Sequence, residues 1–251
     1  MSTSDPSTAS LSTPKTSQID SRPYRQVGWG FWLKWMLATT LGWLIGMLIL
    51  GVEPIRITIE VITYITIAGA FASMFGAIVA ASFGLMQGIV LKSCGFSAWA
   101  WIAASCIGGI VGGIVSDAAF FLIYRLTNLL PVVSFSSPFI GILLMAVAGA
   151  TTGGVVGYFQ GNLLQKRGLS KSYWIRICAT GWAIGCMLGE VVGQSVLGTM
   201  MWPLAAIDAA SDKIILAIFA MISGLIGGAI TGYPLMRALQ QSSIQNLKAE
   251  I

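Results

Sequence analysis

Two carboxylic acids interrupt long apolar segments of this chain, and they are the residues most able to do chemistry there. Asp117 lies in "IVSDAAFF" and Glu190 in "CMLGEVVGQS". An ionised side chain is costly in hydrocarbon, so an acid at such a position predicts a cation or proton site. The structural alternative is that each acid is protonated, hydrogen-bonded to a neighbouring helix, or able to reach the membrane surface. Each stands 16 residues after a tryptophan, or about 24 Å along a helix, which predicts a position near one boundary of the hydrocarbon.

Amide and hydroxyl side chains form a second candidate set. Gln87 and Gln160 occupy matching places in two similar segments, and Thr231 takes that place in a third. One interpretation is hydrogen bonding between helices, which contributes about 0.6 kcal/mol on average in membranes. The other is that the three side chains line a polar path, with the acids at one level and the amides at another.

The residues that catalysis and metal binding use most are missing. The sequence contains no histidine, no phosphate-binding loop, and no zinc-protease or serine-hydrolase motif. Its four cysteines form no CxxC pair, which favours a packing role. We therefore expect no enzyme, no catalytic residue, no metal site and no cofactor. Because the sequence has no histidine, a bound pigment would need a Gln or Glu side chain to ligate its magnesium ion.

The elements that must position these residues are membrane helices. The 251 residues are 56% hydrophobic and 9% charged, with a mean hydropathy of +0.82, and a soluble domain would have too few charges to cover its surface. We predict an all-α polytopic transmembrane bundle with six spans, because each is a run of about 20 apolar residues. The predicted spans are 31–51, 67–91, 98–124, 139–164, 173–199 and 214–237.

An internal repeat organises the spans. "GLMQGIVLKSCGFSAWAWIAASCIGGIVGG" (84–113) matches "GYFQGNLLQKRGLSKSYWIRICATGWAIGCML" (157–188) at a constant offset of 73 residues, and weaker copies flank both. A fixed offset across a loop indicates duplication. The prediction is three helical hairpins, 31–92, 97–165 and 171–238, compatible with a pseudo-threefold axis along the membrane normal. Trp35, Trp101 and Trp174 open the odd-numbered spans, and we expect them to anchor the helices at the membrane interface.

Small residues recur every four positions in these spans. In lipid such stripes let helix backbones approach closely, which predicts glycine-zipper packing. The alternative is that the glycines leave space for a polar path or for a pigment-binding face. The packing glycines that we expect are Gly84, Gly88, Gly157, Gly161, Gly185, Gly189, Gly228 and Gly232.

Charge placement predicts the orientation. Most basic residues precede the first span, follow the last, or lie in the second and fourth connections. By the positive-inside rule both termini are then cytoplasmic. We expect a disordered cytoplasmic tail over 1–30, an interfacial helix over 53–66, and a cytoplasmic tail over 239–251. The net charge of +5 fits the lipid bilayer as partner and does not indicate nucleic acid.

The combination of GxxQ, a basic loop, a tryptophan and GWxxG resembles glycine-rich multi-pass membrane proteins of bacteria, including cyanobacteria. The resemblance implies the bacterial plasma membrane, or the thylakoid membrane in a cyanobacterium, and brings no site residues with it. From the residues themselves we expect a channel or secondary carrier for a small ion or polar solute, with Asp117 and Glu190 as binding sites. The alternative is a non-enzymatic subunit or assembly factor that joins a larger photosynthetic or respiratory complex, or copies of itself.

Overall fold

Six helices make up the described part of the computed structural model, which covers residues 27–50, 61–128, 138–204 and 208–249. All six are long and apolar enough to cross a membrane, so the prediction of an all-helical bundle with six spans is confirmed. In hydrocarbon the backbone must satisfy its own hydrogen bonds, and a long apolar run does this as a helix. The helices are α1 (Trp29–Leu50), α2 (Val61–Lys92), α3 (Ala98–Asn128), α4 (Pro138–Gln165), α5 (Lys171–Leu204) and α6 (Asp208–Ala249).

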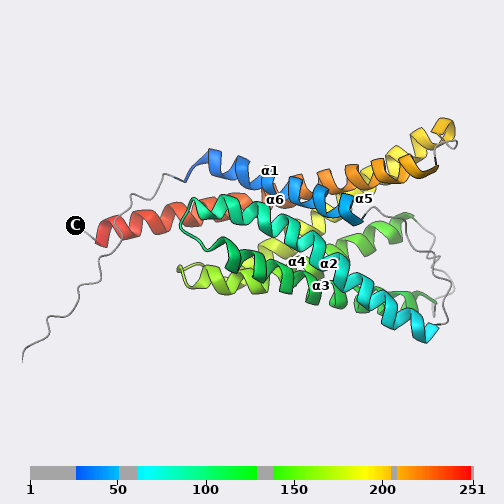
Figure 1. The fold of residues 1–251 in the computed structure, drawn as a ribbon, viewed down its shortest axis with the longest axis horizontal. Coiled ribbons are helices and arrows are strands. Elements are labelled where there is room, and N and C mark those ends of the chain that lie inside the picture. The colour runs from blue at the N-terminus through cyan, green and yellow to red at the C-terminus, as the bar shows by residue number, and fades with distance from the viewer. Residues whose placement is uncertain (1–26, 51–60, 129–137, 205–207, 250–251) are drawn as a thin grey trace, which may run out of the picture.

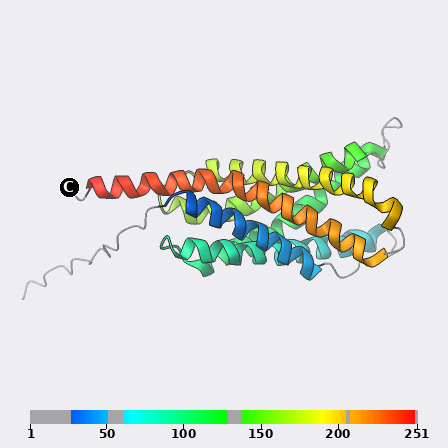
Figure 2. The ribbon, with the colours of Figure 1, turned by 90° about the horizontal axis from the view of Figure 1, so that it is seen from above.

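Some helices run beyond the predicted spans. Residues 61–66 of the expected interfacial segment belong to α2, and 53–60 lie outside the described residues. Residues 1–26 of the expected N-terminal tail also lie outside them. At the other end of the chain, α6 continues through most of the expected C-terminal tail to Ala249. It projects past the other helices there (Figures 1 and 2).

The six helices run side by side (Figures 1 and 2), and their contacts close into a ring. Each helix packs against its neighbours in the chain, and α6 returns to pack against α1. The most extensive contacts join α4 to α5, α2 to α3, and α1 to α6. In two of these pairs, α2 with α3 and α4 with α5, a short turn joins the helices, whereas α1 and α6 lie at opposite ends of the helix order. The helices of each predicted hairpin, α1 with α2, α3 with α4 and α5 with α6, are also in contact.

Two short turns of the same design link α2 to α3 and α4 to α5. In the first, Gly95 has a φ of +76°, and Phe96 N donates to Leu91 O at 3.2 Å. Gly168 has a φ of +80° in the second turn, and Leu169 N donates to Leu164 O at 3.2 Å. This is the Schellman helix end, in which glycine takes the left-handed conformation without steric cost. Both turns lie at one end of the bundle.

This end, where α1 begins and α6 ends, is called the basic end below. The described cations there are Lys34, Lys92, Lys166, Arg167, Lys171, Arg176 and Arg237. Arg167 donates to the carbonyl oxygen of Gly95 at 2.7 Å, so it joins the two turns. Among the residues with described side chains, Arg125 and Lys213 are the cations near the opposite end.

Glycines stand where the paired helices approach most closely. A Cβ on Gly84 of α2 would lie 2.6 Å from Ser105 Cβ, and one on Gly157 of α4 would lie 2.8 Å from Cys178 Cβ. A Cβ on Gly228 of α6 would lie 3.0 Å from Thr39 Cβ. Real Cβ atoms essentially never approach to less than 3.0 Å and rarely to 3.0–3.4 Å, so glycine permits these backbone distances. The other five predicted packing glycines also face a neighbouring helix at 2.5–3.3 Å: Gly88, Gly161, Gly185, Gly189 and Gly232.

Candidate functional site

Three tryptophans meet at the centre of the bundle near its basic end. Trp35, Trp101 and Trp174 expose 0%, 0% and 4% of their surface. Their ring centroids are 5.8, 6.2 and 6.4 Å apart, and each pair is edge-on, the geometry that aromatic rings prefer. The expectation that they anchor the helices at the membrane interface was wrong. These side chains form a tryptophan triad in the core and fill the centre of the ring.

Each indole N–H of the triad donates to a polar side chain of another helix. Trp101 Nε1 bonds Gln87 Oε1 at 3.1 Å, and Trp174 Nε1 bonds Gln160 Oε1 at 3.4 Å. Trp35 Nε1 bonds Thr231 Oγ1 at 3.0 Å, across 196 residues of chain. A buried donor without a partner is costly, so the three residues that the sequence singled out as amide or hydroxyl sites satisfy the triad.

The two glutamines extend these bonds to a third helix. Gln87 Nε2 donates to Thr39 Oγ1 at 2.9 Å, and Gln160 Nε2 donates to Ser105 Oγ at 3.0 Å. Both amides are buried, with 4% and 3% exposed. The interhelical hydrogen bonds that the sequence analysis considered are therefore present, and the acceptor of each one stands four residues after a triad tryptophan.

Among the described residues, the bonds from Trp35 to Thr231 form a shorter set, which does not extend to a third helix. Cys178 stands four residues after Trp174, where the other two helices carry Thr39 and Ser105. Thr231 does not reach as far as a glutamine, and it donates to Gly227 O in its own helix at 2.7 Å. Within the described residues no buried side-chain nitrogen or oxygen lacks a partner. The polar layer formed by Gln87, Gln160, Thr231, Thr39 and Ser105 is thus fully bonded.

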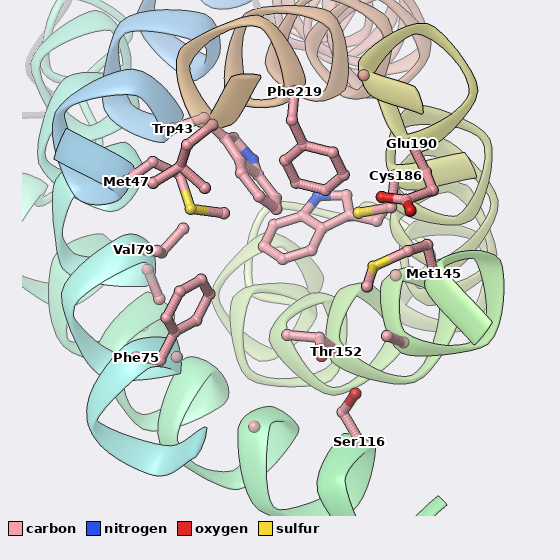
Figure 3. Close-up of a pocket in the computed structure, with 18 of the residues that line it drawn as sticks. Trp43, Met47, Phe75, Val79, Ser116, Met145, Thr152, Cys186, Glu190 and Phe219 are labelled. Atoms are coloured by element: carbon pink, nitrogen blue, oxygen red, sulfur yellow. The ribbon is translucent and has the colours of Figure 1, made fainter. Parts of the chain in front are cut away.

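A cavity of about 570 Å³ lies beyond the polar layer, away from the basic end. Residues of all six helices line it, and Figure 3 looks into it. Four aromatic side chains of its lining pack edge-on with centroids 5.0–6.3 Å apart: Trp43, Phe83, Trp182 and Phe219. Met47 and Met145 lie on opposite sides of the cavity (Figure 3). We call this space the central cavity.

Both predicted acids line the central cavity. Glu190 is half-buried on α5 and accepts a hydrogen bond from Gln194 Nε2 at 2.7 Å. Its Oε1 faces α4, where a Cβ on Gly141 would lie 3.8 Å away. Asp117 is half-buried on α3, and the described residues give it no hydrogen bond or ion pair. The cavity thus brings together two acids that are 73 residues apart in the chain.

The predicted site residues therefore fall into two groups at different depths. Asp117 and Glu190 line the cavity, whereas Gln87, Gln160 and Thr231 lie in the polar layer and are bonded to the triad. Sequence reasoning missed the aromatic walls. Trp43 and Trp182 each stand eight residues after a triad tryptophan, and this repeated spacing was the available signal.

The four cysteines are all free thiols. Cys178 and Cys186 are buried, and Cys94 and Cys106 are half-buried. Cys94 lies in the turn between α2 and α3, outside the spans. Burial raises the pKa of its thiol above the ordinary value, against a smaller lowering by the hydroxyl of Ser93. Within the described residues no three His, Cys, Asp or Glu side chains gather as a metal-ligand set would.

Six apolar helices closed into a ring define a multi-pass membrane protein, in contact with the lipid bilayer. Comparisons of the chain with protein-family models, curated proteins and solved structures gave no match.

Proposed function

We propose that the protein is a non-enzymatic secondary carrier that binds a small solute in the central cavity. The observation that carries the proposal is the cavity itself, about 570 Å³ and lined by all six helices. Small-molecule sites typically occupy about 300–1,000 Å³ and bury most of their ligand. Because the tryptophan triad fills the bundle at the basic end, the solute arrives from the opposite end. It leaves past the triad when the helices rearrange.

A repeated architecture supports this proposal. We take the repeat unit to be an even helix with the odd helix packed on it: α2 with α3, α4 with α5, and α6 with α1. Each unit carries the same bond from a tryptophan to Gln87, Gln160 or Thr231, and the same close approach at Gly84, Gly157 or Gly228. A pseudo-threefold axis with glycine-zipper seams accounts for both. Transporters commonly bind their substrates where such repeats meet.

The acids and the polar layer have separate roles in the proposed carrier. Asp117 and Glu190 attract the cationic or proton-donating part of the solute, since both line the cavity. Gln87, Gln160 and Thr231 hold the triad closed through its indole N–H groups. When the helices part and these bonds break, the same side chains line the path.

The orientation follows from charge. We place the basic end, and with it both chain termini, in the cytoplasm, because Lys and Arg concentrate there and cytoplasmic segments are enriched in these residues. The membrane is the bacterial plasma membrane, or the thylakoid membrane in a cyanobacterium.

Flux through proteoliposomes tests the carrier. The purified protein is expected to move an inorganic cation, a proton or a small organic solute down its gradient. Asp117→Asn and Glu190→Gln should each slow that flux at least tenfold, because each removes a charge from the cavity. Asp5→Asn, the same kind of change ahead of the first helix, is the matched control and should leave the rate unchanged.

The second candidate is a non-transporting subunit or assembly factor. The polar layer favours this role. All its buried donors and acceptors have partners, so opening the layer would break hydrogen bonds and satisfy no unpaired group. Absence of flux for every solute tested, together with stable co-purification in a larger complex, would establish this role and reject the carrier.

A further inference from the structure

We infer that the ligand of the central cavity is a small organic cation with an aromatic or other apolar body. The inference narrows the solute of the proposed carrier. Transport of this ligand rests on the proposed function, whereas its binding in the cavity is tested separately.

The size of the cavity argues against an inorganic ion. A bound ion needs several oxygen ligands at short range to replace its water. The central cavity measures about 570 Å³, and its described lining offers few polar groups, spread over different helices. A space of this size suits a molecule with a body of its own.

The walls specify what that body is made of. Trp43, Phe75 and Phe219 present aromatic rings to the cavity, and Met47 and Met145 add thioethers (Figure 3). Such side chains cannot replace the hydrogen bonds that a polar solute loses with its water, but they pack well against rings and alkyl chains. Methionine adapts to ligands of differing shape. The walls therefore select an apolar or aromatic body.

Charge specifies the rest of the ligand. Among the described residues that line the cavity, Asp117 and Glu190 are the charged ones, and none is a lysine or arginine. A cation in this space would meet one acid, Asp117, that the described residues leave without a partner. Aromatic faces also attract cations, most strongly where water is excluded. A neutral apolar molecule would pack against the aromatic and thioether side chains but would make no favourable contact with the two acids.

A matched pair of probes tests the inference on the full chain in lipid nanodiscs. 1-Methyl-4-phenylpyridinium carries a permanent positive charge, and 4-phenylpyridine has nearly the same shape but is neutral at pH 8. Equilibrium dialysis should show saturable binding of the cation, at least tenfold tighter than binding of the neutral molecule. Quenching of tryptophan fluorescence should accompany binding, because Trp43 and Trp182 line the cavity.

Variants then locate the site. Glu190→Gln and Asp117→Asn should each weaken binding of the cation about tenfold and leave binding of the neutral probe unchanged. Ala148→Phe places a ring in the cavity, which Ala148 lines, and should abolish binding of both probes. Trp99→Phe is the control, since Trp99 is 81% exposed, and it should bind as the unmodified protein does.

The outcomes separate this inference from the proposed function. Equal affinity for the two probes, or no binding of the cation, overturns the organic-cation ligand even where inorganic ions are carried in an acid-dependent way. Charge-dependent binding of the cation, without flux of that probe or of any other solute tested and with stable co-purification in a larger complex, supports the ligand class and rejects the carrier.

Discussion

At the scale of single residues, the triad shows how a membrane core can hold large polar-tipped side chains. Trp35, Trp101 and Trp174 are buried together, which places three indole N–H donors out of reach of water. Each donor finds an acceptor on another helix. The acceptors fix the depth and rotation of each ring, because the bond requires both the right height and the right direction. These bonds therefore specify how neighbouring helices are aligned.

Trp101→Phe tests that role. Phenylalanine keeps an aromatic ring in the triad but removes the donor to Gln87 Oε1, so a buried amide oxygen loses its partner. Leaving a buried group unsatisfied costs about 1–3 kcal/mol, and we expect a loss of unfolding free energy in that range in mixed micelles, followed by circular dichroism.

Two comparisons define that result. Trp99→Phe, at an exposed position of the same helix, should change the free energy of unfolding by less than about 0.5 kcal/mol. The double variant Trp101→Phe/Gln87→Leu should lose less free energy of unfolding than the two single variants added together, because the two side chains interact. Strict additivity of the two would contradict a hydrogen bond between them.

At the scale of the helices, close approach of the backbones replaces the hydrophobic effect. Lipid tails are as apolar as leucine, so helices gain from contact mainly through van der Waals packing and hydrogen bonds. Glycine lets the main chains meet, and even one added methyl group would collide with the neighbouring helix. This collision is expected only on the face of a helix that meets its neighbour, so two adjacent glycines can differ in how well they tolerate a methyl group.

Gly153 and Gly154 of α4 form a matched pair for testing this. A Cβ on Gly153 would lie 2.6 Å from Cys178 O and 2.7 Å from Trp182 Cβ, whereas one on Gly154 would meet only Ala179 Cβ at 3.6 Å. Gly153→Ala should destabilise the protein by about 1–3 kcal/mol through overpacking. Gly154→Ala should be neutral or stabilise it by up to about 1 kcal/mol, because alanine is the better helix former. Thermal unfolding in detergent measures both, and equal effects would contradict the packing.

At the scale of the whole molecule, the ring depends on the return of α6 to α1. Trp35 donates to Thr231, Trp32 Nε1 donates to Ala229 O at 3.0 Å, and Gln240 Nε2 donates to Val27 O. These contacts join the beginning of α1 to the second half of α6 at the basic end (Figure 2). The return of α6 to α1 completes the ring of helices, and residues of all six helices line the central cavity.

Labelling of thiols tests which side of the membrane this end faces. In a variant that keeps only Cys94, a charged methanethiosulfonate reagent that does not cross membranes should react in inside-out vesicles and not in right-side-out ones. Lys213→Cys in a variant without native cysteines reports the exposed opposite end, and it should show the reverse pattern.

The pH dependence of that labelling follows from burial. The thiolate is the reacting form, and the pKa of Cys94 lies above its ordinary value, so the reactive fraction is small at neutral pH and grows as the pH rises. Labelling should therefore accelerate from pH 7 to pH 9 and be slower than for the same thiol in denatured protein. Reaction of Cys94 only in right-side-out vesicles would reverse the proposed orientation.

The number and nature of the elements could be predicted from the sequence alone, because a run of apolar residues that must satisfy its own backbone in lipid has one solution, the helix. The offset of 73 residues also predicted that Asp117 and Glu190 form a pair, and both line one cavity. The closest helix partners could not be predicted. Hydropathy is the same whether a helix meets its neighbour in the chain or one far away, as the 196 residues between Trp35 and Thr231 illustrate.

Tertiary structure also decided where the tryptophans point. An indole at the end of a span suits either the membrane surface or a core that supplies an acceptor, and composition does not distinguish these environments. The acceptors are Gln87, Gln160 and Thr231, each on a different helix from the tryptophan it serves. Only the packing of the six helices brings each donor and its acceptor to the same depth in the bundle.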